Sequence, residues 1–301
     1  MTPPVGTLEV AISRERRRVT DFVLLTKPRV VLMVLVTTMV GYYLGSPPPV
    51  DYLRLLSALV GTALAAAGAL ALNQFLERDV DARMERTRLR PLPDGRLQSG
   101  EALAFGLTIT VAGVLYLWLV IGTLAALVTA IIVVLYLFAY TPLKLRSPLC
   151  LVVGAVPGAL PPVTGWVAAR GEFGVGAWVL FGILFLWQVP HTLAIARLYR
   201  DDYARAGIHV LPVVDPGGMS TERQIVAGCL ALLSVGLLPT LIGLTGPVYF
   251  FGALGLGVGL LVCAMSQAML RSIQTARRLM FASLLYLPLL LGLMVLDKVT
   301  F

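Results

Sequence analysis

The stretch NQFLERDVDARMERTRLRPLP, residues 73–93, carries five acids and bases in its first eleven positions. It follows residues 55–72, a run without a single charged side chain. An apolar run of about 20 residues is long enough to cross a bilayer as a helix. A charged cluster directly after such a run is typical of the point where the chain leaves the lipid. The stretch therefore predicts a membrane helix that ends in a polar site.

The composition agrees with a membrane protein. The chain has 301 residues, of which 58% are hydrophobic and 13% are charged, whereas a soluble domain has about 25% charged residues. The net charge is +8, but the basic residues lie in short loops between apolar runs, which predicts membrane topology and no nucleic-acid partner. Cys150, Cys229 and Cys263 are widely spaced and form no zinc or redox motif.

The intervals between charged residues give the number of spans. Glu101 and Lys144 enclose 42 uncharged residues, enough for two helices with a turn near Gly122. Arg223 and Arg271 enclose 47, enough for two helices separated at residues 245–247. With five single spans in the remaining gaps, we predict an all-α integral membrane protein of nine transmembrane helices.

The distribution of positive charge predicts the orientation. With the N-terminus in the cytoplasm, the inside segments carry 21 of the 24 Lys and Arg residues, and the outside segments carry only Arg54, Arg170 and Lys298. This bias follows the positive-inside rule. We expect a flexible polar cytoplasmic arm over residues 1–20 and one nine-helix domain over 21–301. Its polar loops 77–100 and 198–222 would lie on the cytoplasmic side of a bacterial-type inner membrane.

The first polar cluster has the residue types of a metal–diphosphate site. Asn73, Glu77 and Asp81 recur every four residues, so a helix places them on one face. Their oxygens suit Mg²⁺, and the guanidinium groups of Arg86 and Arg90 match phosphate oxygens. The alternative is a set of solvated ion pairs at the membrane edge. The neutral amide of Asn73, aligned with the acids at the membrane end, favours a site.

A second polar cluster, residues 187–212, lies four spans later on the same side. Tyr199, Arg200 and Asp202 are its candidate site residues. One of the two histidines, His191 or His209, is a candidate partner for an iron porphyrin, and we expect His191 to bind it. The alternative for His191 is an ordinary hydrogen bond near a helix end.

Six ordered segments resemble the UbiA-type intramembrane prenyltransferases, and within them the branch that acts on haem. They cover the chain from about residue 20 to 298: LLTKPRVV (24–31), the opening stretch (73–93), GALPPVTGW (158–166), WQVPH (187–191), YRDDYARAGIHVLPVV (199–214) and FASLLYLPLLL (281–291). The resemblance implies nine helices around a lateral cavity that opens to lipid. It also implies transfer of the farnesyl group of farnesyl diphosphate to a vinyl group of haem B, with addition of water to give haem O and diphosphate.

The resemblance also implies roles for particular residues. By this resemblance, Asn73, Glu77 and Asp81 would be catalytic by holding Mg²⁺ and diphosphate. Beyond the resemblance, we expect His191 to bind haem and Tyr199 and Asp202 to be catalytic, with Asp202 or a residue near Tyr199 assisting the attacking water. Haem B is a substrate here and not a cofactor. The residues expected to bind diphosphate are Lys27, Arg29, Arg86, Arg90, Lys144 and Arg200.

Three other functions stay open at this point. The first is another UbiA-type prenyltransferase that acts on an aromatic or quinone precursor. The second is a membrane transporter, although the sequence lacks ionisable residues in the middle of its spans. The third is a non-catalytic assembly subunit. Expected partners are membrane lipid, and haem A synthase or terminal oxidase assembly factors.

Overall fold

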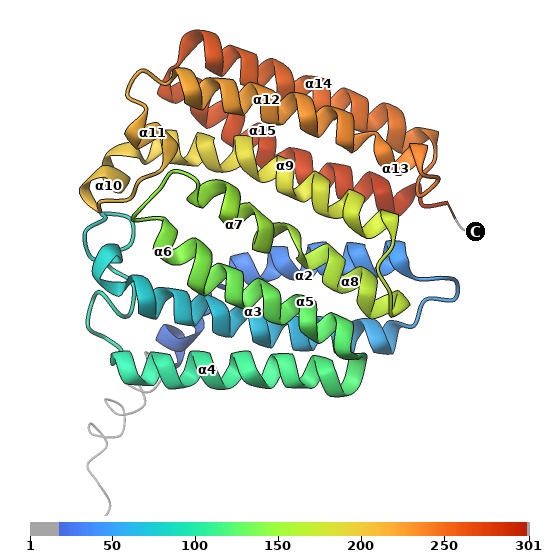
Figure 1. Ribbon diagram of the computed structural model, residues 1–301, viewed down its shortest axis with the longest axis horizontal. Coiled ribbons are helices and arrows are strands. Elements are labelled where there is room, and N and C mark those ends of the chain that lie inside the picture. The colour runs from blue at the N-terminus through green and yellow to red at the C-terminus, as the bar shows by residue number, and fades with distance from the viewer. Residues whose placement is uncertain (1–17, 300–301) are drawn as a thin grey trace, which may run out of the picture.

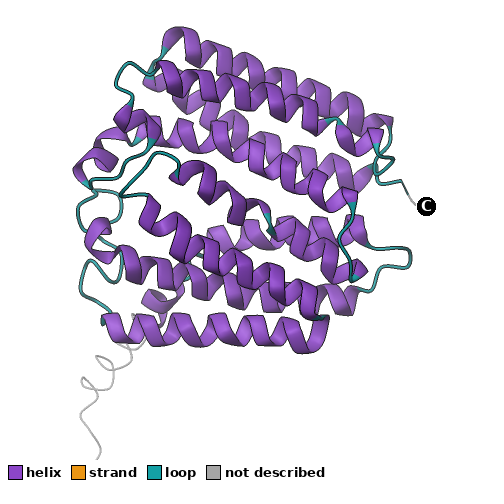
Figure 2. Cartoon of the chain, in the orientation of Figure 1, coloured by secondary structure: helices purple, strands orange, loops and turns teal. Residues whose placement is uncertain are grey.

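The computed structural model describes residues 18–299, which form a bundle of roughly parallel and antiparallel helices (Figure 1, Figure 2). Within this part of the chain, nine segments are helical, long and apolar enough to cross a membrane. The predicted all-helical class and number of spans are confirmed. Residues 1–17 of the predicted arm lie outside the described residues, and residues 18–25 are helical.

The spans follow one another with short connections. In chain order they are α2 (Pro28–Gly45), α3 (Tyr52–Asp81), α4 with a π-helical end (Ser99–Ile121), α5 to α6 (Thr123–Leu143), α7 and α8 (Cys150–Arg170), α9 (Val175–Leu198), α12 and α13 (Met219–Leu241), α14 (Pro247–Leu270) and α15 (Ile273–Leu296). Two short helices, α10 (Arg200–Arg205) and α11 (Leu211–Val214), lie between α9 and α12.

The helix boundaries follow from the local sequence. Gly122 has a φ of 138° and makes the turn between α4 and α5, where the sequence predicts one. Proline is tolerated in the first turn of a helix, and α14 begins at Pro247. The side chain of Asp51 accepts a hydrogen bond from the Arg54 backbone N–H at 2.9 Å and caps α3.

Close packing of α2 against α8 depends on two glycines. A Cβ atom added to Gly41 would lie 2.0 Å from the Pro162 carbonyl oxygen, and one added to Gly165 would lie 1.9 Å from the Thr38 carbonyl oxygen. Small residues let helices in lipid approach backbone to backbone, where van der Waals contact supplies the association energy. This contact fixes α2, whose first turn follows Lys27, beside the rest of the bundle.

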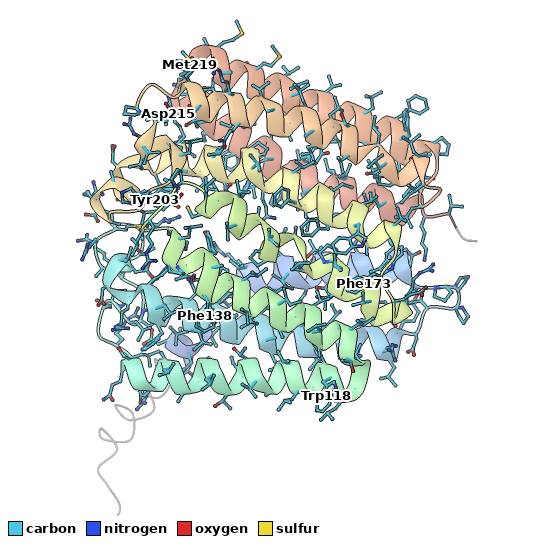
Figure 3. All side chains as sticks on the ribbon, viewed as in Figure 1. Trp118, Phe138, Phe173, Tyr203, Asp215 and Met219 are labelled. Atoms are coloured by element: carbon cyan, nitrogen blue, oxygen red, sulfur yellow. The ribbon has the colours of Figure 1, made fainter. Side chains whose placement is uncertain are left out.

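The two ends of the bundle differ in character. Residues 82–98 and 199–218 form the charged end, where Tyr203 lies, and Phe173 lies at the opposite end (Figure 3). Large apolar side chains such as Trp118 and Phe138 are exposed on the flank, at 53% and 72%. Exposed apolar surface on this scale is a lipid-facing surface. The chain is a multi-pass membrane protein.

Candidate active site

The charged end holds a polar cavity of about 290 Å³ between α3, α9 and the loops beyond them. Its lining includes all three residues of the predicted metal site and four of the six predicted diphosphate-binding residues. The members of this set are Lys27, Asn73, Glu77, Asp81, Arg86, Arg90 and Lys144. The i, i+4, i+8 spacing therefore does place the three oxygen-bearing side chains on one face of α3, toward a common space.

Each of the two carboxylates is paired with a basic residue from another segment. Lys144 Nζ donates to Glu77 Oε1 at 2.6 Å, and Arg90 Nη1 donates to Asp81 Oδ2 at 2.6 Å. Burial opposes the charge of Lys144, but Tyr140 and Glu77 outweigh it and raise the pKa of the lysine above its usual value. Lys144 is therefore charged near neutral pH.

Asn73 is fully buried, and all its polar atoms have partners. Its Oδ1 accepts hydrogen bonds from Lys27 Nζ at 3.0 Å and from the Tyr136 hydroxyl at 3.1 Å. Its Nδ2 donates to Thr141 Oγ1 at 3.1 Å. The Asn73 amide thus connects α3 to the residue just before α2 and to the end of the fourth span.

Lys27 reaches this position through an unusual backbone conformation. It has φ 49° and ψ 65°, the left-handed region that non-glycine residues seldom adopt. Strain of this kind is concentrated at functional sites. Burial, followed by the positive charge of Arg90, lowers the pKa of Lys27 to about 7. The lysine is therefore half protonated near neutral pH in the free protein.

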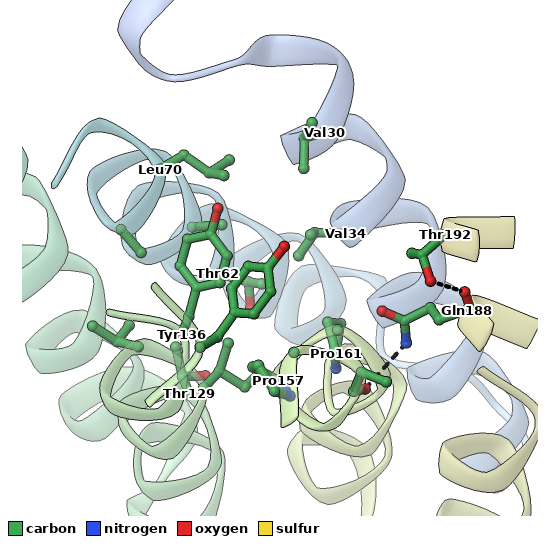
Figure 4. A pocket seen from close by; sticks show the side chains of 18 of the residues that line it. Val30, Val34, Thr62, Leu70, Thr129, Tyr136, Pro157, Pro161, Gln188 and Thr192 are labelled. Atoms are coloured by element: carbon green, nitrogen blue, oxygen red, sulfur yellow. Dashed lines mark hydrogen bonds between the residues drawn. The ribbon is translucent and has the colours of Figure 1, made fainter. Parts of the chain in front are cut away.

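A second, apolar cavity of about 230 Å³ continues from the polar one into the bundle. The two cavities share Tyr136, Tyr140, Leu151 and Thr192. Figure 4 shows Val34, Tyr136 and Gln188 around the apolar cavity. Together the cavities provide a polar head compartment and an apolar tail compartment.

Tyr136 and Tyr140, which lie between these compartments, were not predicted from the sequence as site residues. Their rings are stacked with centroids 5.6 Å apart, and Lys144 Nζ lies 4.3 Å from the centre of the Tyr140 ring. Both belong to a π-helical segment, Leu135–Tyr140. Such segments often occur at functional sites. The available signal was a pair of tyrosines four residues apart, directly before the basic loop that holds Lys144.

Other predicted site residues lie outside the lining of these two cavities. Arg29 is exposed. Asp202 is paired with Arg205, three residues away. Arg200 is half-buried in α10. No role of these three in diphosphate binding or catalysis follows from their positions, and their assigned roles stay predictions.

Tyr199 has an indirect connection to the site. It is 40% exposed and does not line the polar cavity. The guanidinium carbon of Arg86, which does line it, lies 5.0 Å from the centre of the Tyr199 ring and 5.5 Å from that of Tyr203. The Arg86 guanidinium also donates to the Tyr203 hydroxyl at 3.3 Å. Two tyrosines thus hold Arg86 in place.

His191 lies beside α15 and lines neither cavity. Its Nδ1 is 2.9 Å from Ser283 Oγ, and its ring stacks on Trp187 with centroids 4.6 Å apart. This is the hydrogen-bonded alternative that the sequence left open. A contact with haem stays a prediction.

The oxygen donors of the polar cavity suit a hard divalent cation. Among residues 18–299, no three His, Cys, Asp or Glu side chains gather as a metal cluster. The predicted set is different, because it combines the Asn73 amide with the carboxylates of Glu77 and Asp81, and all three face one cavity. Carboxylates and amide oxygens are ligands that Mg²⁺ accepts while it keeps waters and phosphate oxygens in its shell. The residues present therefore fit this metal.

A polar head compartment joined to an apolar tail compartment inside a helical bundle suits an enzyme that handles prenyl diphosphates. The chain belongs to the UbiA prenyltransferase family, whose model matches residues 34–285. It is therefore a prenyltransferase of the membrane-embedded type.

The names of its relatives specify a particular prenyltransferase. The chain is 48% identical to the protoheme IX farnesyltransferase of Solibacter usitatus, with 92% of this chain and 98% of the relative covered. It is 43% identical to the protoheme IX farnesyltransferase of Koribacter versatilis, with 92% and 93% covered.

Solved structures support the fold. The chain is similar to a structure of digeranylgeranylglyceryl phosphate synthase, with a TM-score of 0.79, 15% identity, and 93% and 98% of the two chains covered. It is also similar to a UbiA homologue from Archaeoglobus fulgidus bound to GPP and Mg²⁺. There the TM-score is 0.65, the identity is 14%, and the coverage is 91% and 99%. At these identities the likeness concerns the fold.

Proposed function

We propose that the chain transfers the farnesyl group of farnesyl diphosphate to a vinyl carbon of haem B, giving haem O. The observation that supports this most is the continuity of the polar and apolar cavities through Tyr136 and Tyr140. An amphiphile with a diphosphate head and an isoprenoid tail matches both compartments. The acceptor follows from the two relatives, both of which are named protoheme IX farnesyltransferase. The similarity covers 98% and 93% of their lengths.

The polar cavity would stabilise the leaving group. When the allylic C–O bond breaks, negative charge develops on the diphosphate, and the nearby basic residues are positioned before the reaction. Four basic residues line the polar cavity, and Arg90 and Lys144 are paired with carboxylates. Within residues 18–299, the other two, Arg86 and Lys27, form no ion pair with a carboxylate. They are the first candidates to contact the diphosphate, and Arg90 and Lys144 would follow by exchanging carboxylate for phosphate oxygens.

A bound Mg²⁺ would add positive charge at the leaving diphosphate, with Asn73, Glu77 and Asp81 as its protein ligands. The solved A. fulgidus homologue is bound to Mg²⁺ together with GPP, and this supports the assignment. In the protein as described, Lys144 and Arg90 hold Glu77 and Asp81 in place toward the cavity.

The transfer needs no nucleophilic side chain. The C–O bond of the farnesyl diphosphate breaks, and the electrons of the haem vinyl group form the new C–C bond to the farnesyl carbon. Water adds to the cationic carbon beside the pyrrole and loses one proton, which the released diphosphate takes up. Tyr136 and Tyr140 line both cavities and would face the developing allylic cation, which aromatic rings stabilise.

The positive charge of the loops supports a location in a bacterial-type inner membrane with the polar cavity toward the cytoplasm. Farnesyl diphosphate would then enter with its tail in lipid and its head at the cytoplasmic surface. The product is a membrane-soluble haem, so a haem-oxidising enzyme or an oxidase assembly factor is the expected recipient.

An acceptor competition tests the substrate assignment. Purified protein in detergent receives labelled farnesyl diphosphate, Mg²⁺ and equal amounts of haem B and 4-hydroxybenzoate. We expect label in haem O, identified by mass, and none in the phenolic acid. Label in 4-hydroxybenzoate alone would reject the proposed acceptor and leave the prenyltransferase class intact.

A further inference from the structure

A third cavity, of about 270 Å³, lies at the end of the bundle opposite the charged end. The ends of α2 and α8, the start of α9 and the C-terminal residues Lys298 and Val299 enclose it. The prenyl-transfer proposal does not use it. It contains two of the three basic residues that the sequence places outside the cytoplasm, Arg170 and Lys298.

Both basic residues are held in place by backbone carbonyls. Arg170 Nε donates to the Gly45 carbonyl at 2.8 Å. Lys298 Nζ donates to the carbonyls of Tyr43 and Ser46 at 2.6 and 2.7 Å. The guanidinium carbon of Arg170 lies 5.2 Å from the centre of the Trp166 ring. Within residues 18–299 its terminal nitrogens have no hydrogen-bond acceptor, and a guanidinium group has five N–H donors.

The acidic residues nearest to Lys298 and Arg170 in the sequence, Asp297 and Glu172, form no ion pair with them in the described chain. Among the ion pairs of the described chain, neither Arg170 nor Lys298 has an acidic partner. Asp297 uses its carboxylate to accept the Tyr249 backbone N–H at 2.7 Å, and Glu172 is exposed. Burial and the charge of Arg170 lower the pKa of Lys298, which agrees with two cations in one uncompensated space.

A buried donor in the same cavity also lacks a partner. Trp166 is only 5% exposed, and its indole Nε1 has no hydrogen-bond partner in the described chain. A buried donor without an acceptor is costly, and each such group needs an explanation. Gly174 lines the cavity beside this nitrogen and supplies no side chain, and a Cβ added there would lie 3.1 Å from Nε1. The indole N–H is therefore an unused donor in the wall of the cavity.

We propose that this cavity binds a phosphate oxyanion, supplied by the headgroup of an anionic phospholipid in the outer leaflet. Arg170 and Lys298 provide charge-assisted donors around one space, and the unused indole N–H of Trp166 lies in its wall. The apolar rim favours a lipid source, because Val175 at 67% and Ile242 at 39% are exposed beside the cavity. Free phosphate would accept from the same donors, but it has no apolar part that could contact this rim.

Native mass spectrometry of the full chain in detergent tests the proposal. We expect phosphatidylglycerol to stay bound at concentrations where phosphatidylcholine and inorganic phosphate do not. Arg170→Gln should weaken phosphatidylglycerol binding about tenfold, and Arg170→Lys should retain most of it. Arg54→Gln is the matched control, because Arg54 lies on the same side but binds the carbonyls of Ala168 and Ile121 and does not line the cavity.

A second variant avoids changes of charge. Gly174→Ala places a methyl group 3.0 Å from Trp166 Cζ2, so the buried indole must shift. The variant should weaken phosphatidylglycerol binding, with only a small loss of thermal stability in the absence of lipid. Equal binding of phosphatidylglycerol and phosphatidylcholine, or equal phosphatidylglycerol binding by wild type and Arg170→Gln, would overturn the proposal. Binding of inorganic phosphate as tight as that of phosphatidylglycerol would assign the site to free phosphate and overturn the lipid source.

Discussion

Lys144 and Glu77 are 67 residues apart in the chain and form an ion pair of 2.6 Å at the rim of the polar cavity. Their side chains are only 18% and 14% exposed. The pair joins the end of the fourth span to the face of α3 that carries Asn73 and Asp81. The acidic residues that line this cavity both lie on α3, whereas the basic residues come from several other segments.

Glu77→Gln and Asp81→Asn should each lower turnover by about a hundredfold or more, because both remove a charged ligand at the developing diphosphate. The measurement is haem O formation by purified protein with saturating farnesyl diphosphate and Mg²⁺. Asp79→Asn is the control, since the Asp79 side chain is 78% exposed and its one ion pair within residues 18–299 is with Arg78 at 3.8 Å. Wild-type rates in Asp81→Asn would remove this residue from the reaction.

The affinity for farnesyl diphosphate should depend on pH through Lys27. Its pKa of about 7 is that of the free protein, and a bound diphosphate favours the protonated form. Affinity should therefore be highest below pH 7 and fall as the pH rises above it, by up to about tenfold per pH unit.

Lys27→Arg provides the matched control for this dependence, because arginine stays charged throughout. The ionisation of the substrate itself is the same in both proteins, so the difference between the two pH profiles isolates Lys27. Superimposable profiles of dissociation constant against pH would show that Lys27 does not titrate on binding.

The apolar cavity should set the length of the prenyl chain. Ala66 lines it from α3, and Ala66→Phe would fill part of the tail compartment. We expect kcat/KM for farnesyl diphosphate to fall about tenfold or more, and that for geranyl diphosphate to fall less. Ala104→Phe on the exposed face of α4 adds the same ring elsewhere and should leave both values unchanged. An equal loss for both substrates in Ala66→Phe would place the tail in another part of the molecule.

Tyr199 should act by positioning Arg86. Tyr199→Leu removes one aromatic face from the guanidinium group and should raise the KM for farnesyl diphosphate about two- to fivefold, the range of an exposed cation–π contact. Tyr199→Phe keeps the ring 5.0 Å from the guanidinium carbon and should behave as wild type. A loss of kcat in Tyr199→Phe would contradict a positioning role and show that the hydroxyl takes part in the chemistry.

Much of the fold could be predicted from the sequence because lipid imposes simple rules on it. Apolar intervals of span length predicted the nine spans found within residues 18–299, and Gly122 correctly marked a turn. The i+4 spacing of Asn73, Glu77 and Asp81 placed the three side chains on one face, because α3 continues without a break to Asp81.

The remaining parts of the site depend on contacts that no local pattern encodes. Lys27 reaches Asn73 only through its left-handed backbone conformation. Tyr136 and Tyr140 lie in a π-helical segment, and apolar composition gave no sign of that segment. His191 has a polar partner on α15, 92 residues away, which its own surroundings in the sequence could not reveal.

The most direct test is haem O formation by the purified chain from haem B and farnesyl diphosphate, with Mg²⁺ and then with excess chelator. We predict a haem whose mass has increased by one farnesyl group and one water-derived hydroxyl group, formed with Mg²⁺ and lost with chelator. Undiminished product in chelator would contradict a metal held by Asn73, Glu77 and Asp81. Haem B recovered unchanged in the presence of Mg²⁺ would contradict the transfer itself.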